Sequence, residues 1–236
     1  MASRISITTS RDDQFIAASA LSRALDELKD CSHAFIGGFA WAILGSDRAT
    51  EDIDVLIQTK NMDLMEIRET LLELNKHFAV AGFKFYFVKE PRDDLTGDRL
   101  VFASKDNVLI ETLKAGTLGL PSVAGPIYVL QHSSGVALKI LHPGVLILTK
   151  MKRWVATKDS DRPKTVTKTR SDKRDLDYLV FWLVQHEMTI EFELYLGKRK
   201  EELLAYVRAY RDCIPEGSEL LEALQTAVKS DDWKLL

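Results

Sequence analysis

A pair of glycines followed by two alternating acids constrains this chain more than any other part of its sequence. Residues 34–36 form a short apolar run, which predicts a buried strand that ends at Gly37-Gly38. Glycine has no Cβ, so this pair permits a tight turn and a close approach of the backbone to a ligand. The apolar residues 39–44 suit a helix, whose amino end would favour an anion. The block therefore predicts a strand, a turn and a helix with space for a phosphate.

A second apolar run, residues 51–57, carries two carboxylates. Side chains alternate along a strand, so Asp52 and Asp54 are expected on one face while Ile53 and Val55 point into the core. Two carboxylates this close repel each other unless a cation joins them, and magnesium commonly holds substrate phosphates with one or two carboxylates. The pattern predicts a metal and nucleoside triphosphate site. The competing interpretation is an ordinary turn followed by an edge strand whose aspartates face solvent.

The glycine pair, 13 intervening residues and Asp-hydrophobic-Asp-hydrophobic together resemble the signature of the polymerase-β-like nucleotidyltransferase superfamily. The lead-in Arg48-Ala49-Thr50 resembles its AbiEii-like and related small branches. The resemblance implies an α/β (α+β) nucleotidyltransferase fold, with a mixed β-sheet, flanking helices and two metal ions held by three carboxylates. It also implies that Arg48 and Thr50 help Gly37 and Gly38 to position the nucleotide. The alternative is that Arg48 and Thr50 only shape the loop before the strand.

A third acid lies in a later apolar run. Residues 99–104 and 107–113 are predicted strands separated by a tight turn at residues 105–106. Glu111 falls on a face otherwise shared with leucines, which is unfavourable for an acid that is neither paired nor bound to metal. The resemblance implies a third metal ligand on such a strand, and we expect Glu111 to be that ligand. The family commonly has aspartate there, so Asp106 is the fallback candidate, and an exposed edge-strand acid is the alternative for Glu111.

Beyond residue 143 the sequence becomes helical and basic. Residues 144–156 and 172–186 have apolar stripes that predict helices, whereas residues 157–171 lack such a period and predict a mobile or partly disordered loop. Residues 150–175 contain ten Lys or Arg against four Asp. This excess of positive charge could gather a triphosphate or a nucleic-acid backbone. An ordinary solvated loop is the commoner explanation for such a run.

The same region extends the resemblance. AbiEii-like proteins carry a lysine in a Leu-Leu-x-x-Lys helix and, after a loop, a basic residue with Lys-Asp-Leu and a further acid. The helix around Lys150 matches the first motif, and residues 170–176 are similar to the second with a shifted register. The resemblance implies that Lys150 contacts triphosphate oxygens and that Asp172 or Lys173 shapes the acceptor side. Asp172 and Asp175 would also suit the start of a helix, so capping is the alternative.

Length and composition fit an enzyme-sized chain. With 236 residues and 46% hydrophobic content it can bury a substantial core. A net charge of −3 and a pI near 6.0 argue against a protein that holds nucleic acid mainly by bulk electrostatics. We expect a nucleotidyltransferase core over residues 1–140 and a helical C-terminal region over residues 141–236.

The sequence also predicts a compartment. It has no apolar run of membrane-spanning length and no signal-peptide pattern near its amino terminus. Cys31 and Cys213 match neither a metal-binding nor a redox spacing, which suits a reducing environment. A cytoplasmic protein without a membrane partner is therefore expected.

The activity expected from these features is two-metal nucleotidyl transfer. Asp52 and Asp54 would bridge two Mg²⁺ (or Mn²⁺) ions and Glu111 would complete one of them, while an acceptor attacks the α-phosphorus of an NTP and pyrophosphate leaves. The acceptor stays open among RNA, protein and a small molecule. A catalytically inactive nucleotidyltransferase-fold protein that binds a nucleotide or a partner is the alternative, and an unrelated α/β domain is a third possibility.

Overall fold

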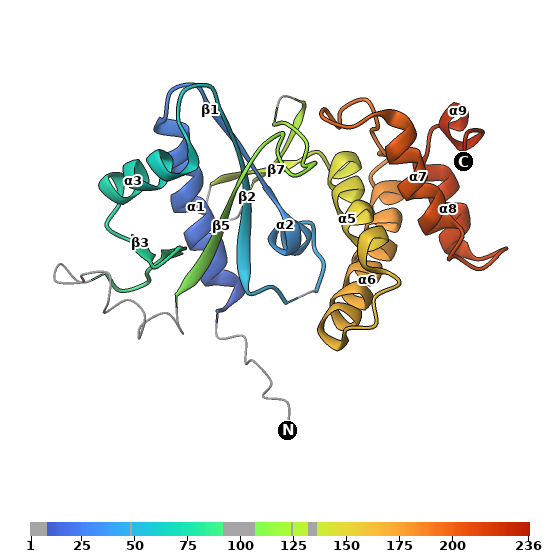
Figure 1. Ribbon diagram of the computed structural model, residues 1–236, viewed down its shortest axis with the longest axis horizontal. Helices are drawn as coiled ribbons and strands as arrows, with labels where there is room; N and C mark the ends of the chain where they lie inside the picture. The colour runs from blue at the N-terminus through green and yellow to red at the C-terminus, as the bar shows by residue number, and fades with distance from the viewer. Residues whose placement is uncertain (1–8, 48, 92–106, 124, 132–135) are drawn as a thin grey trace. The chain divides into compact units, whose positions relative to one another are not determined.

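A computed structural model of the chain describes residues 9–47, 49–91, 107–123, 125–131 and 136–236. In these residues a mixed seven-stranded sheet is accompanied by helices (Figure 1). The strands are β1 (Cys31–Ile36), β2 (Asp52–Thr59), β3 (Phe78–Ala81), β4 (Lys84–Phe87), β5 (Val108–Lys114), β6 (Ile127–Gln131) and β7 (Ala137–Leu141). The helices are α1 (Arg11–Glu27), α2 (Gly37–Ile43), α3 (Leu64–Leu74), α5 (Pro143–Thr157), α6 (Pro163–Gln185), α7 (Lys200–Arg211), α8 (Glu219–Ala227) and α9 (Ser230–Trp233).

The sheet has the strand order β3-β4-β5-β2-β1-β7-β6. Strand β1 runs antiparallel to β2 and parallel to β7, and β2 runs parallel to β5. Strand β4 is antiparallel to both β3 and β5. The mixture of directions confirms the predicted mixed sheet, and it brings two strands that are far apart in sequence, β2 and β5, side by side.

Helix α1 covers the central strands of the sheet. Ser10 and Asp13 form a capping box that starts this helix, in which each side chain accepts a hydrogen bond from the other residue's backbone N–H. Its apolar residues Ala17, Leu21 and Leu25 are fully buried, and the helix contacts β1, β2 and β5. Because the buried positions recur every three to four residues, one side of α1 faces the sheet along its whole length.

The chain divides into two compact units. One comprises the residues up to Ala115 together with Val129–Ile140, and the other comprises Gly116–Tyr128 together with Leu141–Leu236. The first, which we call the sheet unit, contains α1, α2, α3 and β1 to β5. The second, the helical unit, contains α5 to α9, in which α5 packs on α6 and α7, and α6 packs on α8.

Most of the predicted elements are present with altered ends. Helix α3 ends at Leu74, because the next residue, Asn75, has an extended backbone and β3 follows at Phe78. The Asp63 side chain caps the start of α3 by accepting hydrogen bonds from the backbone N–H groups of Met65 and Glu66. The predicted strand over residues 99–104 and the fallback ligand Asp106 lie outside the described residues.

The prediction of a loop over residues 157–171 was wrong from residue 163 onward, and only residues 158–162 connect the two helices without helical structure. Helix α6 begins at Pro163, whose ring fixes φ near the helical value and whose missing N–H costs nothing in a first helical turn. The first half of α6 has few apolar residues, and it packs on α5 through polar contacts such as the 2.9 Å hydrogen bond from Thr169 to Thr157. A hydrophobic period therefore could not reveal this part of the helix.

The described residues contain no helix that is both long and apolar enough to cross a membrane.

Candidate functional site

The three predicted metal-binding acids lie on two neighbouring strands of the sheet unit. Asp54 on β2 is aligned with Glu111 on β5, and Asp52 is aligned with Leu109. Aligned residues of adjacent strands point to the same face, as do residues two apart on one strand. Asp52, Asp54 and Glu111 therefore share one face, on which all three are half-buried. Strand geometry puts the Cα atoms of Asp54 and Glu111 about 5 Å apart and Asp52 about 7 Å along β2 from Asp54.

Gly37 borders this carboxylate face. It follows Ile36, which lies opposite Asp54 in the antiparallel pairing of β1 with β2. Its φ is +65°, and a Cβ added to it would lie 1.7 Å from Oδ2 of Asp54. Both the backbone conformation and the space therefore require glycine. Gly38 is buried at the start of α2. The turn at Gly37-Gly38 therefore packs directly against β2, the strand that carries the Asp52-Ile53-Asp54 (DxD) motif.

Thr50 holds the first aspartate. Its buried hydroxyl donates to the backbone carbonyl and to Oδ1 of Asp52, both at 3.2 Å. The side-chain amide of Gln14 in turn donates to the carbonyl of Thr50 at 2.8 Å. Thr50 thus orients a candidate metal ligand, which is a different contact from the expected one with the nucleotide. Arg48, predicted beside it, lies outside the described residues.

The carboxylate face offers oxygen ligands only, the set that Mg²⁺ and Mn²⁺ prefer. Among the described residues no three Asp, Glu, His or Cys side chains converge as a metal-binding group. The backbone register thus aligns Asp52, Asp54 and Glu111 without their carboxyl groups being drawn together. Like charges repel, and a divalent cation between them would offset that repulsion. The residue types and their register therefore fit such an ion.

Lys150, the predicted phosphate contact, lies in the helical unit and is 4% exposed. Its amine donates to Asp172 at 3.1 Å and to Asp175 at 2.9 Å. Arg153 donates two further hydrogen bonds to Asp172. Burial raises the pKa of the Asp172 carboxyl, but the hydrogen bond from Arg153 and the charges of Lys150 and Arg153 outweigh it and hold that pKa below its ordinary value. Since α6 begins at Pro163, these acids do not cap its start.

Lys173, which the resemblance assigns to the acceptor side, is also engaged within the helical unit. Its amine is 3.0 Å from both carboxyl oxygens of Asp177, and it lies 5.6 Å from the ring centroid of Tyr210. The Tyr210 hydroxyl donates to the same carboxylate. Burial and the Asp177 carboxylate raise the pKa of Tyr210 above its ordinary value. The three residues form a network that ties α6 to α7.

Two residues that position these groups were missed in the sequence. Gln14 belongs to the buried stripe of α1, so a polar residue on an apolar helical face was the signal for it. Arg153 entered the sequence analysis only as one of ten positive charges. Its place three residues after Lys150 puts both on one helical face, which is the pattern that could have singled it out.

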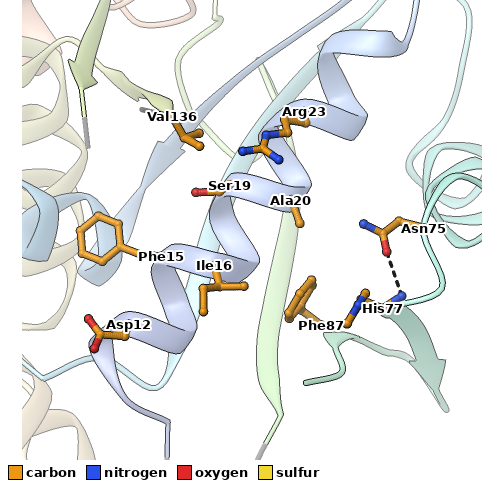
Figure 2. Close-up of a pocket in the computed structure, with 10 residues that line it drawn as sticks. All are labelled: Asp12, Phe15, Ile16, Ser19, Ala20, Arg23, Asn75, His77, Phe87 and Val136. Atoms are coloured by element: carbon orange, nitrogen blue, oxygen red, sulfur yellow. Dashed lines mark hydrogen bonds between the residues drawn. The ribbon is translucent and has the colours of Figure 1, made fainter. Parts of the chain in front are cut away.

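A separate pocket of about 460 Å³ runs along α1 in the sheet unit (Figure 2). One wall comes from the exposed side of α1, including Ile16 and Arg23, and another from Asn75, His77 and Phe87. His77 stacks on Phe87 with ring centroids 5.0 Å apart. No predicted site residue lines this mainly apolar pocket, so it makes no contribution to the carboxylate face.

Comparisons with known proteins identify the family and the fold of the chain. A family model described as "Nucleotidyl transferase AbiEii toxin, Type IV TA system" matches residues 19–236. Among solved structures, an antigenic nucleotidyltransferase-like protein from Paracoccidioides brasiliensis aligns with a TM-score of 0.59 and 18% identity, over 94% of this chain and 96% of that chain. That likeness shows the fold and confirms the predicted architecture.

A second solved structure, CdnC of E. coli MS115-1 with ATP, aligns at 12% identity over 92% of this chain and 90% of that chain. Its TM-score of 0.30 is too low to carry an argument. No curated protein matches the sequence.

Proposed function

Because this chain belongs to the AbiEii nucleotidyl transferase family, we propose that it moves a nucleoside monophosphate from an NTP to an acceptor and releases pyrophosphate. The observation that carries the proposal is the alignment of Asp54 with Glu111 on parallel strands, with Asp52 on the same face. Residues 60–107 separate β2 from β5 in sequence, so only the sheet register brings Glu111 level with Asp52 and Asp54. Such an arrangement serves a reaction in which negative charge accumulates on phosphate oxygens.

In this proposal Asp52, Asp54 and Glu111 hold two divalent cations, Mg²⁺ or Mn²⁺. Cations bound there would offset the charge on the triphosphate and on the attacking and leaving oxygens. Thr50 keeps the Asp52 carboxylate oriented, and Gly37 leaves the space that the Asp54 carboxylate occupies. The acceptor oxygen bonds to the α-phosphorus as the bond to pyrophosphate breaks, and the acceptor releases its proton.

The remaining site residues stay predictions. Lys150 is expected to meet triphosphate oxygens, yet its amine is bound by Asp172 and Asp175, so it would have to exchange one of these partners for a phosphate. Lys173 would likewise have to leave Asp177. The acceptor stays open among RNA, protein and a small molecule. The contacts of Lys150 and Lys173 do not indicate which of these the protein would use.

A second candidate is a protein of this fold that binds a nucleotide without turnover. The observation that favours it is glutamate at position 111, where the family commonly has aspartate. One extra methylene lengthens the side chain by about a bond length, while Mg²⁺ demands near-ideal octahedral geometry. Both candidates bind an NTP, but only the enzyme transfers a nucleoside monophosphate to an acceptor.

The deciding experiment is calorimetric titration of each NTP, with and without Mg²⁺, into wild type and into the double variant Asp52→Asn, Asp54→Asn. We expect Mg²⁺-dependent binding that the double variant loses, because amides cannot replace the charge of two carboxylates. Glu51→Gln is the matched control, since Glu51 is exposed and adjacent to Asp52 but is not assigned to the site. Absence of binding by folded wild type to every NTP would contradict both candidates.

A transfer assay with NTP labelled on the α-phosphate, offered to RNA, protein and small-molecule acceptors, then separates the two candidates. Transfer that Glu111→Gln abolishes while NTP binding persists would support the enzyme and assign Glu111 to the reaction. NTP binding with no transfer to any acceptor would favour the binding module.

A further inference from the structure

A second pocket, lined by polar and charged residues, lies wholly within the helical unit, between α5 and α6. Its volume is about 290 Å³, close to the lower end of the range typical of ligand sites. Three cationic side chains, three threonines and one aspartate surround it. The lining residues are Arg153, Thr157, Lys164, Thr165, Lys168, Thr169 and Asp172.

The aspartate does not make this pocket acidic. Asp172 is 1% exposed and is bound by Lys150 and Arg153, while Lys150 also binds Asp175. Two buried carboxylates are thus matched by two cations. The charge that remains in the pocket is that of Lys164 and Lys168, which are both exposed. Within the part of the chain that the structure describes, neither lysine has a carboxylate partner.

The positions of the two lysines are unfavourable for the helix itself. Lys164 lies in the first turn of α6, where the helix dipole disfavours a cation. Lys168 follows four residues later, and like charges at that spacing repel each other. No acid occurs from residue 162 to residue 171 to relieve them. An anion bound in the pocket would offset both the unfavourable interaction of Lys164 with the helix dipole and the repulsion between the two lysines. The local charge pattern therefore favours an anion-binding site.

The rest of the pocket suits an oxyanion. Arg153 uses two of its five N–H donors on Asp172 and its side chain is 40% exposed, so further donors can face a ligand. Thr169 donates to the Thr157 hydroxyl, which itself donates to the carbonyl of Arg153, and this chain of hydrogen bonds fixes the wall between α5 and α6. Cationic and hydroxyl donors around one small cavity are the groups that bind phosphate.

We propose that the α5–α6 pocket binds phosphate groups, with Lys164 and Lys168 as the cationic ligands. Arg162, exposed and directly before α6, adds a further cation close to Lys164 in sequence. The phosphates can belong to a single phosphodiester strand or to a free polyphosphate, and the two probes of the test distinguish these sources. Binding here requires neither the carboxylate face nor turnover, so the inference stands apart from the proposed transfer.

The test is fluorescence anisotropy of a labelled single-stranded RNA of about twelve nucleotides, within the length that such sites contact, in EDTA and over a range of salt concentrations. Lys164→Gln with Lys168→Gln is the test variant. Lys60→Gln with Lys84→Gln is the control, because it removes the same charge from two exposed lysines of the sheet unit. Circular dichroism and thermal unfolding verify that each variant is folded.

We expect the test variant to bind RNA about 10- to 100-fold more weakly than wild type at low salt, with a log–log salt slope shallower by about 1.4, as two lost phosphate contacts require. The control should bind like wild type. A parallel titration with pyrophosphate in EDTA identifies the source of the phosphate. RNA binding that depends on the two lysines supports a strand, and pyrophosphate binding that alone depends on them supports a free polyphosphate ligand.

The proposal is overturned if wild type binds neither probe, or if the test variant binds both as the control does. The Asp52→Asn, Asp54→Asn variant should retain binding of the probe in EDTA. A loss of NTP binding in that variant and a loss of phosphate binding in the lysine variant are therefore independent results.

Discussion

At the scale of single residues, Gly37 shows how backbone conformation and side-chain chemistry meet at the carboxylate face. Its positive φ lets the chain turn from β1 into α2, and its missing Cβ leaves the space that Asp54 Oδ2 occupies. A pair of glycines in the sequence indicates a turn. That one of them touches the DxD strand depends on the pairing of β1 with β2.

The substitution Gly37→Ala tests this contact. A Cβ at 1.7 Å from Asp54 Oδ2 must displace that carboxylate, so we expect Mg²⁺-dependent NTP binding to fall as far as in Asp54→Asn. The positive φ adds about 1–3 kcal/mol of strain, measurable by urea unfolding. Gly82→Ala is the control, because Gly82 has a similar φ of +61° but no atom within 4 Å of an added Cβ. If Gly37→Ala binds NTP like Gly82→Ala, the close approach has no role at the site.

At the scale of elements, α5 and α6 are joined by a buried polar cluster. Lys150 and Arg153 from α5 hold Asp172, and Lys150 also holds Asp175, both acids being on α6. The sequence places lysine and acids on two helices, yet it gives no sign that they neutralise each other. The first half of α6 was predicted as a loop for the same reason, since polar contacts between helices leave no hydrophobic period.

Lys150→Met removes the cation that the two buried carboxylates share. Breaking a buried ion pair by deleting one partner typically costs about 3–5 kcal/mol, because the remaining charge stays buried without compensation. We therefore expect urea unfolding to show a loss of this size at pH 7. Lys158→Met is the comparison, since Lys158 directly follows α5 and pairs with Asp159 at the surface, so its loss should change stability little. A Lys150→Met protein as stable as Lys158→Met would show that the cluster does not hold α5 to α6.

At the scale of the whole molecule, the two units are not consecutive stretches of chain. Residues 116–128 belong to the helical unit, where the Tyr195 hydroxyl donates to the carbonyl of Gly119. Residues 129–140 return to the sheet unit and include most of β7. A division into a core over 1–140 and a helical region over 141–236 remains a prediction, and a cut at that point would part Gly119 from Tyr195.

Stability of the whole chain should depend on the charge state of His33. This residue is 2% exposed, and its Nε2 lies 2.9 Å from the Ser22 hydroxyl. Burial lowers its pKa to about 4, with the Lys139 charge adding to that effect and Asp26 opposing it. Below about pH 6.5, His33 binds a proton in the unfolded chain but stays neutral in the folded protein. The free energy of unfolding therefore falls as the pH drops from about 6.5 toward 4.

The free energy at stake is about 3 kcal/mol, from a pKa difference between folded and unfolded chains of about 2.5. Urea unfolding at pH 7 and at pH 4.5 measures it. His33→Gln cannot bind this proton in either the folded or the unfolded state. The free energy of unfolding of this variant should therefore decline less than that of wild type over the same pH interval. The other titrating groups should lower the stability of both proteins equally. Identical declines in the two proteins would mean that His33 does not resist protonation.

The sequence alone determined the local features of this protein and its family. Residue periods located β2, β5 and α5, and the glycine pair before Asp52 and Asp54 pointed to the nucleotidyltransferase fold, because such patterns reflect interactions between near neighbours in the chain. The sequence patterns did not predict strands β6 and β7 or the first half of α6. Only the tertiary structure decided that Glu111 lies level with Asp54 and that Lys150 is enclosed by two aspartates. Strand register and burial depend on contacts between residues distant in sequence, and no local pattern encodes which distant partner a residue will meet.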